Sequence, residues 1–289
     1  MISTADAVKQ ANEPLRRSAF WKAVKRPAFF VPSIALILWI IAAVDPGIAP
    51  YAPNAIQSAQ ALAHPSLPHF FGTDQLGRDI FSRIIGGSRD ALVIALLSVL
   101  LGAFVGTVLG IVGGTSTPSV RWLVMRVTDI LLAIPSIVIA MVIITILGEG
   151  VPDLILAIGI SEIPIFIRLS RGATLSVRER PYVEAAEASG AGFFRILFRH
   201  VLPNILNSIL VVVTIDMGAS ILAVAGLTFI GLGPPPPAPE WGSMVTQAQQ
   251  YIPQDWWMAV FPGLVIVVAV LSLNILGEEL QRILNPRIQ

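Results

Sequence analysis

Six long apolar runs divide the sequence, and they constrain its fold more than any other feature. The runs are Ala28–Val44, Ala91–Gly114, Val127–Leu147, Val151–Leu169, Ile205–Gly231 and Ala259–Gly277. A helix needs about 20 mostly apolar residues to cross a bilayer. Only 13% of the residues are charged, whereas a soluble domain carries about 25%. The sequence therefore predicts an all-α polytopic membrane protein with six transmembrane helices.

The basic residues between the runs predict the orientation of the chain, because basic flanks stay on the cytoplasmic side. The N-terminal segment is basic, and six arginines lie between residues 168 and 199. The segments 148–150 and 232–258 have no Lys or Arg. Arginines in the long segment before the second run depart from this pattern, but the rule is weaker for long loops. We therefore expect both termini in the cytoplasm. A signal peptide is the alternative for the first run, but the run exceeds the usual ~7–15 residues.

These boundaries predict four parts. They are a cytoplasmic segment at 1–27, a first transmembrane helix with an external loop at 28–90, a five-helix core at 91–280 that contains a cytoplasmic loop at 170–203, and a cytoplasmic tail at 281–289. The net charge of +1 gives no indication of a nucleic-acid partner. The absence of cysteine excludes thiol catalysis and thiolate metal sites.

The loop at 170–203 holds the most informative stretch, RPYVEAAEASG at residues 180–190. Pro181 suits the first turn of a helix, the alanines favour helix, and Gly190 can adopt the left-handed conformation that ends one. A second short helix is predicted over Phe193–His200. Its aromatic and aliphatic side chains are too many to leave in water, so they must pack on the bundle or on a partner.

The spacing of the EAA triplet, Gly190 and a Leu-Pro pair resembles the EAA loop of ATP-binding-cassette importer permeases. In that family the loop forms the coupling helices, which dock into a groove on the ATP-hydrolysing subunit. The resemblance assigns the coupling role to Glu184, Ala185, Ala186, Gly190, Phe193, Leu202 and Pro203. His200 stands where the general pattern has an aliphatic residue.

A second motif, FGTDQLGRDIFSR at residues 71–83, resembles the segment before the second span in dipeptide, oligopeptide and nickel importer permeases. Within that group the chain is similar to the C-type subunit, which has an extra N-terminal span. The motif residues are Gly72, Thr73, Asp74, Gly77, Arg78 and Asp79. The stretches 125–135 and 226–242 also match, although Thr228 stands where serine is common.

The resemblance implies a type I importer permease fold and a heteromeric complex in the bacterial inner membrane. The partners would be a sister permease, two ATP-binding subunits, an extracytoplasmic substrate-binding protein and membrane lipid. The three lysines, Lys9, Lys22 and Lys25, have no P-loop context. ATP and Mg²⁺ would therefore bind the partners, and we expect no cofactor, metal or catalytic residue on this chain.

Three acidic residues lie within or at the edge of the apolar runs, where ionisable groups are costly. Asp129 is expected to pair with Arg126 or Arg168. Glu162 and Asp216 either line the translocation path or pack within the bundle, and the sequence leaves both interpretations open. The alternative function is a solitary secondary transporter or channel that uses these two acids as a proton relay. A membrane-embedded enzyme would need clustered catalytic groups that the sequence does not offer.

Glycines, prolines and tryptophans in the runs carry further predictions. Gly102, Gly106, Gly110 and Gly114 recur at a spacing of four, which favours close helix packing, within the subunit rather than at a dimer seam. Prolines at 135, 164 and 262 are expected to interrupt their spans. Tryptophans at 241, 256 and 257 suit an interfacial belt. His64, His69 and His200 have no metal-ligand spacing.

The substrate is left open by the sequence. Relatives with this set of motifs carry dipeptides, longer peptides, glutathione or nickel. The absence of cysteine and histidine clusters in the external loops favours peptides.

Overall fold

The computed structural model describes residues 27–284, and the regular structure within that range is helical. Residues 1–26 and 285–289, which hold the predicted cytoplasmic segment and most of the predicted tail, lie outside the described range. The helices are α2 (Pro27–Val44), α3 (Ile80–Thr115), α4 (Pro118–Leu132), α5 (Ser136–Leu147), α6 (Val151–Arg178), α7 (Pro181–Ala188), α8 (Phe193–Ile196), α9 (Leu202–Phe229), α10 (Trp241–Ala248) and α11 (Trp257–Leu284), with a π-helical turn at Leu197–Val201 and 3-10 turns at Pro46–Ile48, Ser58–Gln60 and Gln249–Tyr251.

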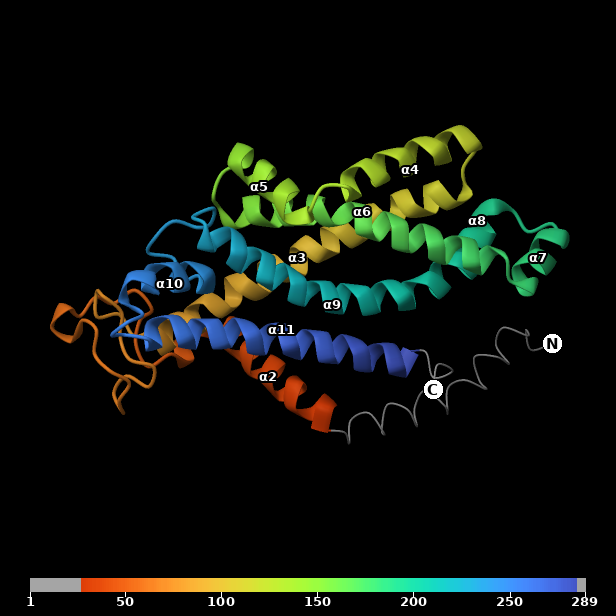
Figure 1. Cartoon of the computed structure of the whole chain (residues 1–289). Helices are drawn as coiled ribbons and strands as arrows, with labels where there is room; N and C mark the ends of the chain where they lie inside the picture. Colours follow the sequence, from red (N-terminus) through yellow and green to blue (C-terminus); the bar gives the residue numbers. More distant parts are fainter. Residues whose placement is uncertain (1–26, 285–289) are drawn as a thin grey trace.

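The long helices α3, α6, α9 and α11 form an elongated bundle, and α2 packs on α3 and α11 (Figure 1). Helices α7 and α8 project at one end, which we name the loop end. The irregular segment 45–79 and helix α10 lie at the opposite end, which we name the motif end. The two sequence motifs are therefore separated by the length of the bundle.

A seam of glycines brings α3 against α6. A Cβ atom placed on Gly102 would lie 2.9 Å from the Cβ of Glu162, and one placed on Gly106 would lie 2.5 Å from the Cβ of Phe166. Such distances allow only glycine, because real Cβ atoms do not approach other heavy atoms so closely. The predicted packing of the glycine repeat within the subunit is confirmed.

The third predicted span is interrupted at Pro135, as expected. Helix α4 ends at Leu132, α5 begins at Ser136, and the two are bent by 90°. Pro135 lies at the break, where it lacks an N–H and disfavours helical geometry in the residue before it. Its carbonyl accepts from the backbone N–H of Val138 at 2.9 Å and so starts α5.

The other two prolines do not interrupt their spans, contrary to the prediction. Helix α6 continues through Pro164 and α11 continues through Pro262. In both helices the packing of the neighbouring helices overrides the loss of one backbone hydrogen bond.

Three helical stretches are long and apolar enough to span a membrane, namely Ile80–Thr115, Phe193–Phe229 and Trp257–Leu284. The bent pair α4–α5 qualifies when it is counted as one span, and α2 is a shorter apolar helix. Helix α6 also runs the length of the bundle, although it carries Asp153, Glu162 and Arg168.

Two predicted boundaries differ from the structure. Helix α3 begins at Ile80 rather than Ala91, so the end of the predicted external loop is helical. The Asp79 side chain starts this helix early, because its Oδ2 atom accepts from the Ser82 backbone N–H at 2.7 Å. Helix α11 extends to Leu284, past the predicted end of the core at residue 280.

The sequence predicts three tryptophans at a membrane interface, and for two of them this prediction is wrong. Trp241 and Trp257 are fully buried at the motif end, whereas Trp256 is half exposed. The Trp241 indole donates to the Ile84 carbonyl at 3.0 Å, and the Trp257 indole donates to the Thr73 carbonyl at 3.3 Å. Buried indoles need such acceptors, and backbone carbonyls far away in the sequence supply them here.

Candidate functional site

Helix α7 carries the EAA triplet at the loop end and ends in a complete Schellman motif. Gly190 has a φ of +83°, and its N–H donates to the Glu187 carbonyl at 2.9 Å. The Ala191 N–H donates to the Ala186 carbonyl at 3.0 Å. This pair of hydrogen bonds needs a left-handed residue between helix and turn, which glycine adopts without strain. The predicted helix, turn and role of Gly190 in local geometry are confirmed.

Helix α7 is exposed on nearly all sides. Its single buried residue is Val183, which belongs to a hydrophobic cluster with Val177, Ile196 and Val201. Glu184 and Ala185 are exposed. Val183 therefore packs α7 onto the end of α6 and the turn before α9, Glu187 adds an exposed contact to Arg178 at 3.5 Å, and most of the helix surface is available to a partner.

The second predicted helix forms, but it is not a separate arm. Helix α8, the π-helical turn and α9 join into one continuous stretch, Phe193–Phe229. Leu202 and Pro203 lie at the start of α9 as predicted, directly after the π-helical turn. Phe193, Phe194 and Phe198 are 50–71% exposed in the described chain.

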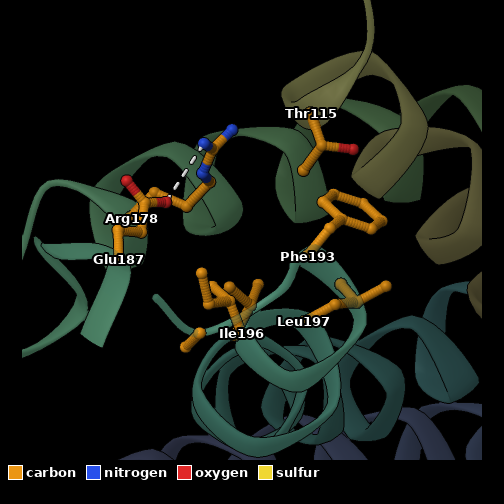
Figure 2. Close-up of a pocket in the computed structure, with 8 residues that line it drawn as sticks. Thr115, Arg178, Glu187, Phe193, Ile196 and Leu197 are labelled. Atoms are coloured by element: carbon orange, nitrogen blue, oxygen red, sulfur yellow. Dashed lines mark hydrogen bonds and ion pairs between the residues drawn. The ribbon is translucent and has the colours of Figure 1, made fainter. Parts of the chain in front are cut away.

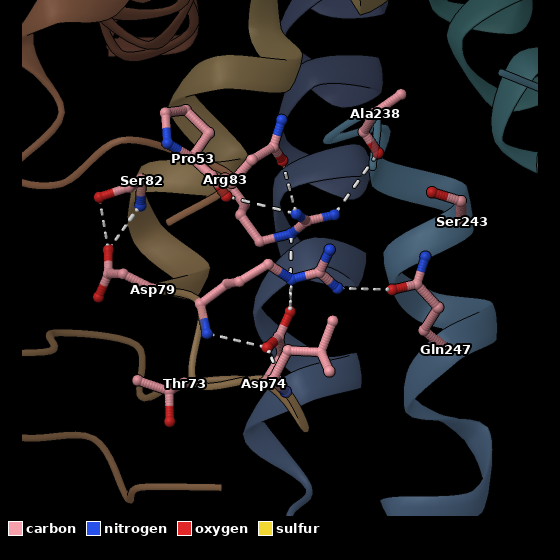
Figure 3. Close-up of polar contacts among 12 residues, drawn as sticks. Pro53, Thr73, Asp74, Asp79, Ser82, Arg83, Ala238, Ser243 and Gln247 are labelled. Carbon is pink, nitrogen blue, oxygen red and sulfur yellow. Dashed lines mark hydrogen bonds and ion pairs between the residues drawn. The ribbon is translucent and has the colours of Figure 1, made fainter. Parts of the chain in front are cut away.

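The motif at residues 72–79 forms a buried polar network at the other end of the molecule (Figure 3). Asp74 Oδ1 accepts from the Arg78 backbone N–H at 2.9 Å, and its Oδ2 accepts from Arg78 Nε at 2.6 Å. The Arg78 guanidinium also donates to Gln247 Oε1 at 3.2 Å, which ties the motif to α10. Gly72 and Gly77 both have a φ of +74°, which explains the two glycines of the motif.

His69 and Gln60, which precede the motif, also belong to this network. His69 Nδ1 lies 2.9 Å from Asp79 Oδ1, and the Thr73 hydroxyl donates to the Gln60 carbonyl at 2.5 Å. All three of His69, Thr73 and Asp79 are buried. Because these polar groups are buried and hydrogen-bonded to one another, the network has a structural role and is not a surface that meets a partner. We name this network of residues 69–83 the lock.

Arg83 is a residue of this lock that sequence reasoning did not single out. Its side chain is 1% exposed and donates to the Pro53 carbonyl at 3.3 Å, Asn54 Oδ1 at 3.1 Å and the Ala238 carbonyl at 3.5 Å. Arg83 Nε also lies 3.9 Å from Asp74 Oδ2, so the same carboxylate contacts both arginines of the network. The hydrogen-bond partners of Arg83 come from two distant segments, around residue 53 and at residue 238, and no local pattern in the sequence connects them.

Glu162 and Asp216 meet inside the bundle, between α6 and α9. The Ser220 hydroxyl donates to Glu162 Oε1 at 3.4 Å. Glu162 is buried, and neither its Oε2 atom nor Asp216 Oδ2 has a hydrogen-bond partner in the part of the chain that the structure describes. Asp129 pairs with Arg168 at 2.7 Å, one of the two predicted partners.

Solved structures define the class of protein that this fold represents. One is a chain of the MetNI methionine ABC transporter in an inward facing conformation, with a TM-score of 0.59 and 20% sequence identity over 70% of this chain and 96% of that one. Another is a chain of an amino acid ABC transporter, with a TM-score of 0.56 and 15% identity over 69% and 93% of the two chains. The molecule has the type I importer permease fold.

The chain belongs to the family described as binding-protein-dependent transport system inner membrane component, which matches residues 106–289. It is 35% identical to the probable D,D-dipeptide transport system permease protein DdpC of Escherichia coli K12, over 92% of this chain and 90% of that protein. It is 37% identical to the di/tripeptide transport system permease protein DppC of Pseudomonas aeruginosa, over 93% and 92%. It is 36% identical to the glutathione transport system permease protein GsiD of Pectobacterium atrosepticum, over 100% and 97%. The predicted family resemblance is confirmed: the chain is a multi-pass membrane permease of an ABC importer, a transport component rather than a catalytic subunit.

Proposed function

We propose that this permease subunit forms half of a translocation path for di- or oligopeptides and couples that path to partner ATPases through α7. The exposed surface of α7, held to the bundle by Val183 and the Gly190 turn, is the observation that supports the proposal. Peptide-like substrates are supported by the names of the relatives, which are transporters of dipeptides, di/tripeptides and glutathione.

In this proposal, ATP and Mg²⁺ bind only the partner ATPases, and closure of the ATPase dimer displaces α7. Val183 transmits that displacement to Val177 at the end of α6 and to Val201 at the start of α9. Because α6 packs along its length on α3, its movement changes the path between this subunit and its sister. The small side chains of Ala185 and Ala186 permit close approach of the partner's groove.

The orientation follows from the same proposal. The loop end, with its arginines, faces the cytoplasm together with both termini, and the motif end faces the side from which a binding protein delivers substrate. This places the chain in the bacterial inner membrane. A cysteine introduced at exposed Ser189 is expected to react with a membrane-impermeant maleimide only after the membrane is opened. One at exposed Ala59 is expected to react in intact spheroplasts.

The coupling role is tested by Gly190→Val in the purified and reconstituted complex. The substitution strains a left-handed turn, so we expect ATP hydrolysis to continue while uptake of a labelled dipeptide falls. Gly192→Val is the matched control, because Gly192 has a φ of −67° and open space around its Cα. Normal coupled uptake in the Gly190 variant, with the complex intact, would contradict the coupling role.

The alternative of a solitary proton-coupled transporter rests on the buried pair of acids between α6 and α9. The double substitution Glu162→Gln and Asp216→Asn distinguishes ATP-driven import from proton-driven transport. We expect ATP-driven uptake to persist in the double variant, and the chain without ATPases to show no uptake under a proton gradient. Proton-driven uptake by the chain alone, lost in the double variant, would replace the importer proposal with the alternative.

A further inference from the structure

An apolar groove of about 770 Å³ lies along α3 and the joined α8–α9 helix, towards the loop end. Its walls include Phe104 and Val108 of α3, and Leu206 and Leu210 of α9. These four side chains are 42–72% exposed. The groove thus presents a continuous apolar surface that the described chain does not cover.

The groove runs into a smaller pocket of about 230 Å³ with a different chemistry. The two share Thr115, Phe193 and Leu197. The smaller pocket adds Arg178 from the end of α6 and Glu187 from α7 (Figure 2). One wall of a largely apolar channel is therefore charged, and only at its loop end.

The Arg178 side chain at this end forms only a weak ion pair. Arg178 Nη2 lies 3.5 Å from Glu187 Oε1, and the two side chains are 36% and 46% exposed. Arg121, also exposed, approaches the carbonyl of Ser116 in the groove wall at 3.4 Å. Two arginines thus flank the point where the apolar groove ends, and an exposed pair such as Arg178–Glu187 holds the arginine only loosely.

We propose that the groove binds an anionic phospholipid of the leaflet on the loop side. Its acyl chain lies between α3 and α9, and its phosphate binds Arg178 and Arg121. Basic pockets between transmembrane helices bind such headgroups, and a long apolar groove that ends in arginines fits an amphiphile with an anionic head. A transmembrane helix of a partner would fill the groove but would bring no anion to its end.

The lipid competes with Glu187 for Arg178. Because Glu187 lies on α7, lipid binding releases a contact between α7 and α6. The site therefore adjusts how tightly the coupling helix is held, an effect that rests on the coupling role proposed above. The binding itself does not depend on that role and is measured without transport.

Native mass spectrometry of the full chain, purified with its co-purifying subunits, tests the headgroup. The probes are dioleoylphosphatidylglycerol and dioleoylphosphatidylcholine, added at equal concentration. We expect preferential retention of phosphatidylglycerol, and loss of that preference in the double variant Arg121→Gln and Arg178→Gln, at roughly fivefold per arginine. Arg126→Gln is the control and should keep the preference, because Arg126 is an exposed arginine of α4 that, unlike Arg121, makes no hydrogen bond to a groove-lining residue in the described chain. Equal retention of both lipids by the wild-type chain would overturn the proposal.

A photoreactive phenylalanine analogue at Val108 tests the occupant directly in native membranes. A lipid adduct of phosphatidylglycerol mass supports the proposal. An adduct to a polypeptide would overturn it and assign the groove to a subunit interface, while leaving the proposed importer function intact. The same analogue at Val142 on α5, which is also exposed but outside the groove, gives the background of lipid labelling.

Discussion

Gly106 on α3 and Phe166 on α6 are in contact without any space for a side chain at position 106. A Cβ there would lie 2.5 Å from the Phe166 Cβ and 2.7 Å from the Ile163 carbonyl oxygen. The α3–α6 seam is therefore fixed by backbone approach, as in other membrane helix pairs.

Gly106→Ala is expected to lower the thermal stability of the detergent-solubilised chain. Forcing a methyl group into a closed contact costs about 1–3 kcal/mol, and here the obstacle includes backbone. Gly263→Ala in α11 is the matched control, because nothing lies within 4 Å of a Cβ at that position. Equal melting temperatures of the two variants, measured by size-exclusion after heating, would refute the packing argument.

Arg83→Gln is expected to destabilise the motif end by on the order of 3 kcal/mol, because it removes a buried charge and leaves its acceptors unpaired. Arg83 is almost completely buried, whereas nearby Arg89 is exposed. Arg89→Gln should therefore leave stability unchanged. The check is limited proteolysis of the segment 45–79 in both variants, and equal cleavage rates would show that the network does not hold this segment.

Glu240 should make stability depend on pH. Burial raises its pKa above the ordinary value of 4.5, and nearby Asp90 raises it further, while hydrogen bonds from Gly242, Ser243 and Thr228 oppose the shift. A raised folded-state pKa gives stability that is complete below pH 4.5 and is lost as pH rises through the raised value.

The measurement is the difference in melting temperature between wild type and Glu240→Gln across this pH range. We expect the wild type to lose stability relative to the variant as pH rises from 4.5 towards neutral. Glu149→Gln, at an exposed position between α5 and α6, controls for the loss of one surface charge. A pH-independent difference for Glu240→Gln would contradict the assignment.

Ala185→Trp tests the docking surface of α7. Ala185 is exposed, so the larger side chain should leave the fold intact. It should instead block the close approach of a partner, and the ATPase subunits should no longer co-purify. Ala59→Trp, at an exposed position of the motif end, should keep them. Retention of the ATPases by the Ala185 variant would place the interface elsewhere.

Local patterns predicted much of this structure from sequence. The helix, turn and Gly190 geometry of the coupling loop follow from residues within eleven positions of one another, Arg180 to Gly190. The four-residue spacing of the glycines in α3 likewise identifies the side of this helix that packs closely on another helix. Both features depend on short-range geometry, which sequence reports directly.

The errors arose where long-range contacts decide the outcome. Trp241 and Trp257 have the sequence context of a membrane interface, yet carbonyls of Ile84 and Thr73 hold them in a buried core. Pro135 breaks its span while Pro164 and Pro262 lie inside continuous helices, a difference that the residue type alone does not predict. The meeting of Glu162 with Asp216 depends on how α6 and α9 align, which neither segment reveals alone.

The lock at the motif end has a consequence for biogenesis. Arg78 and Arg83 are synthesised early, but they also donate hydrogen bonds to Gln247 and Ala238, which are synthesised much later. The Thr73 carbonyl likewise accepts from Trp257, near the end of the chain. A chain that ends before residue 238 keeps the contacts of these arginines to Asp74 and Asn54 but lacks those that join them to the later part of the sequence. The polar network at the motif end is therefore complete only after Gln247 and Trp257 have been synthesised, which makes its assembly one of the last steps in folding of the subunit.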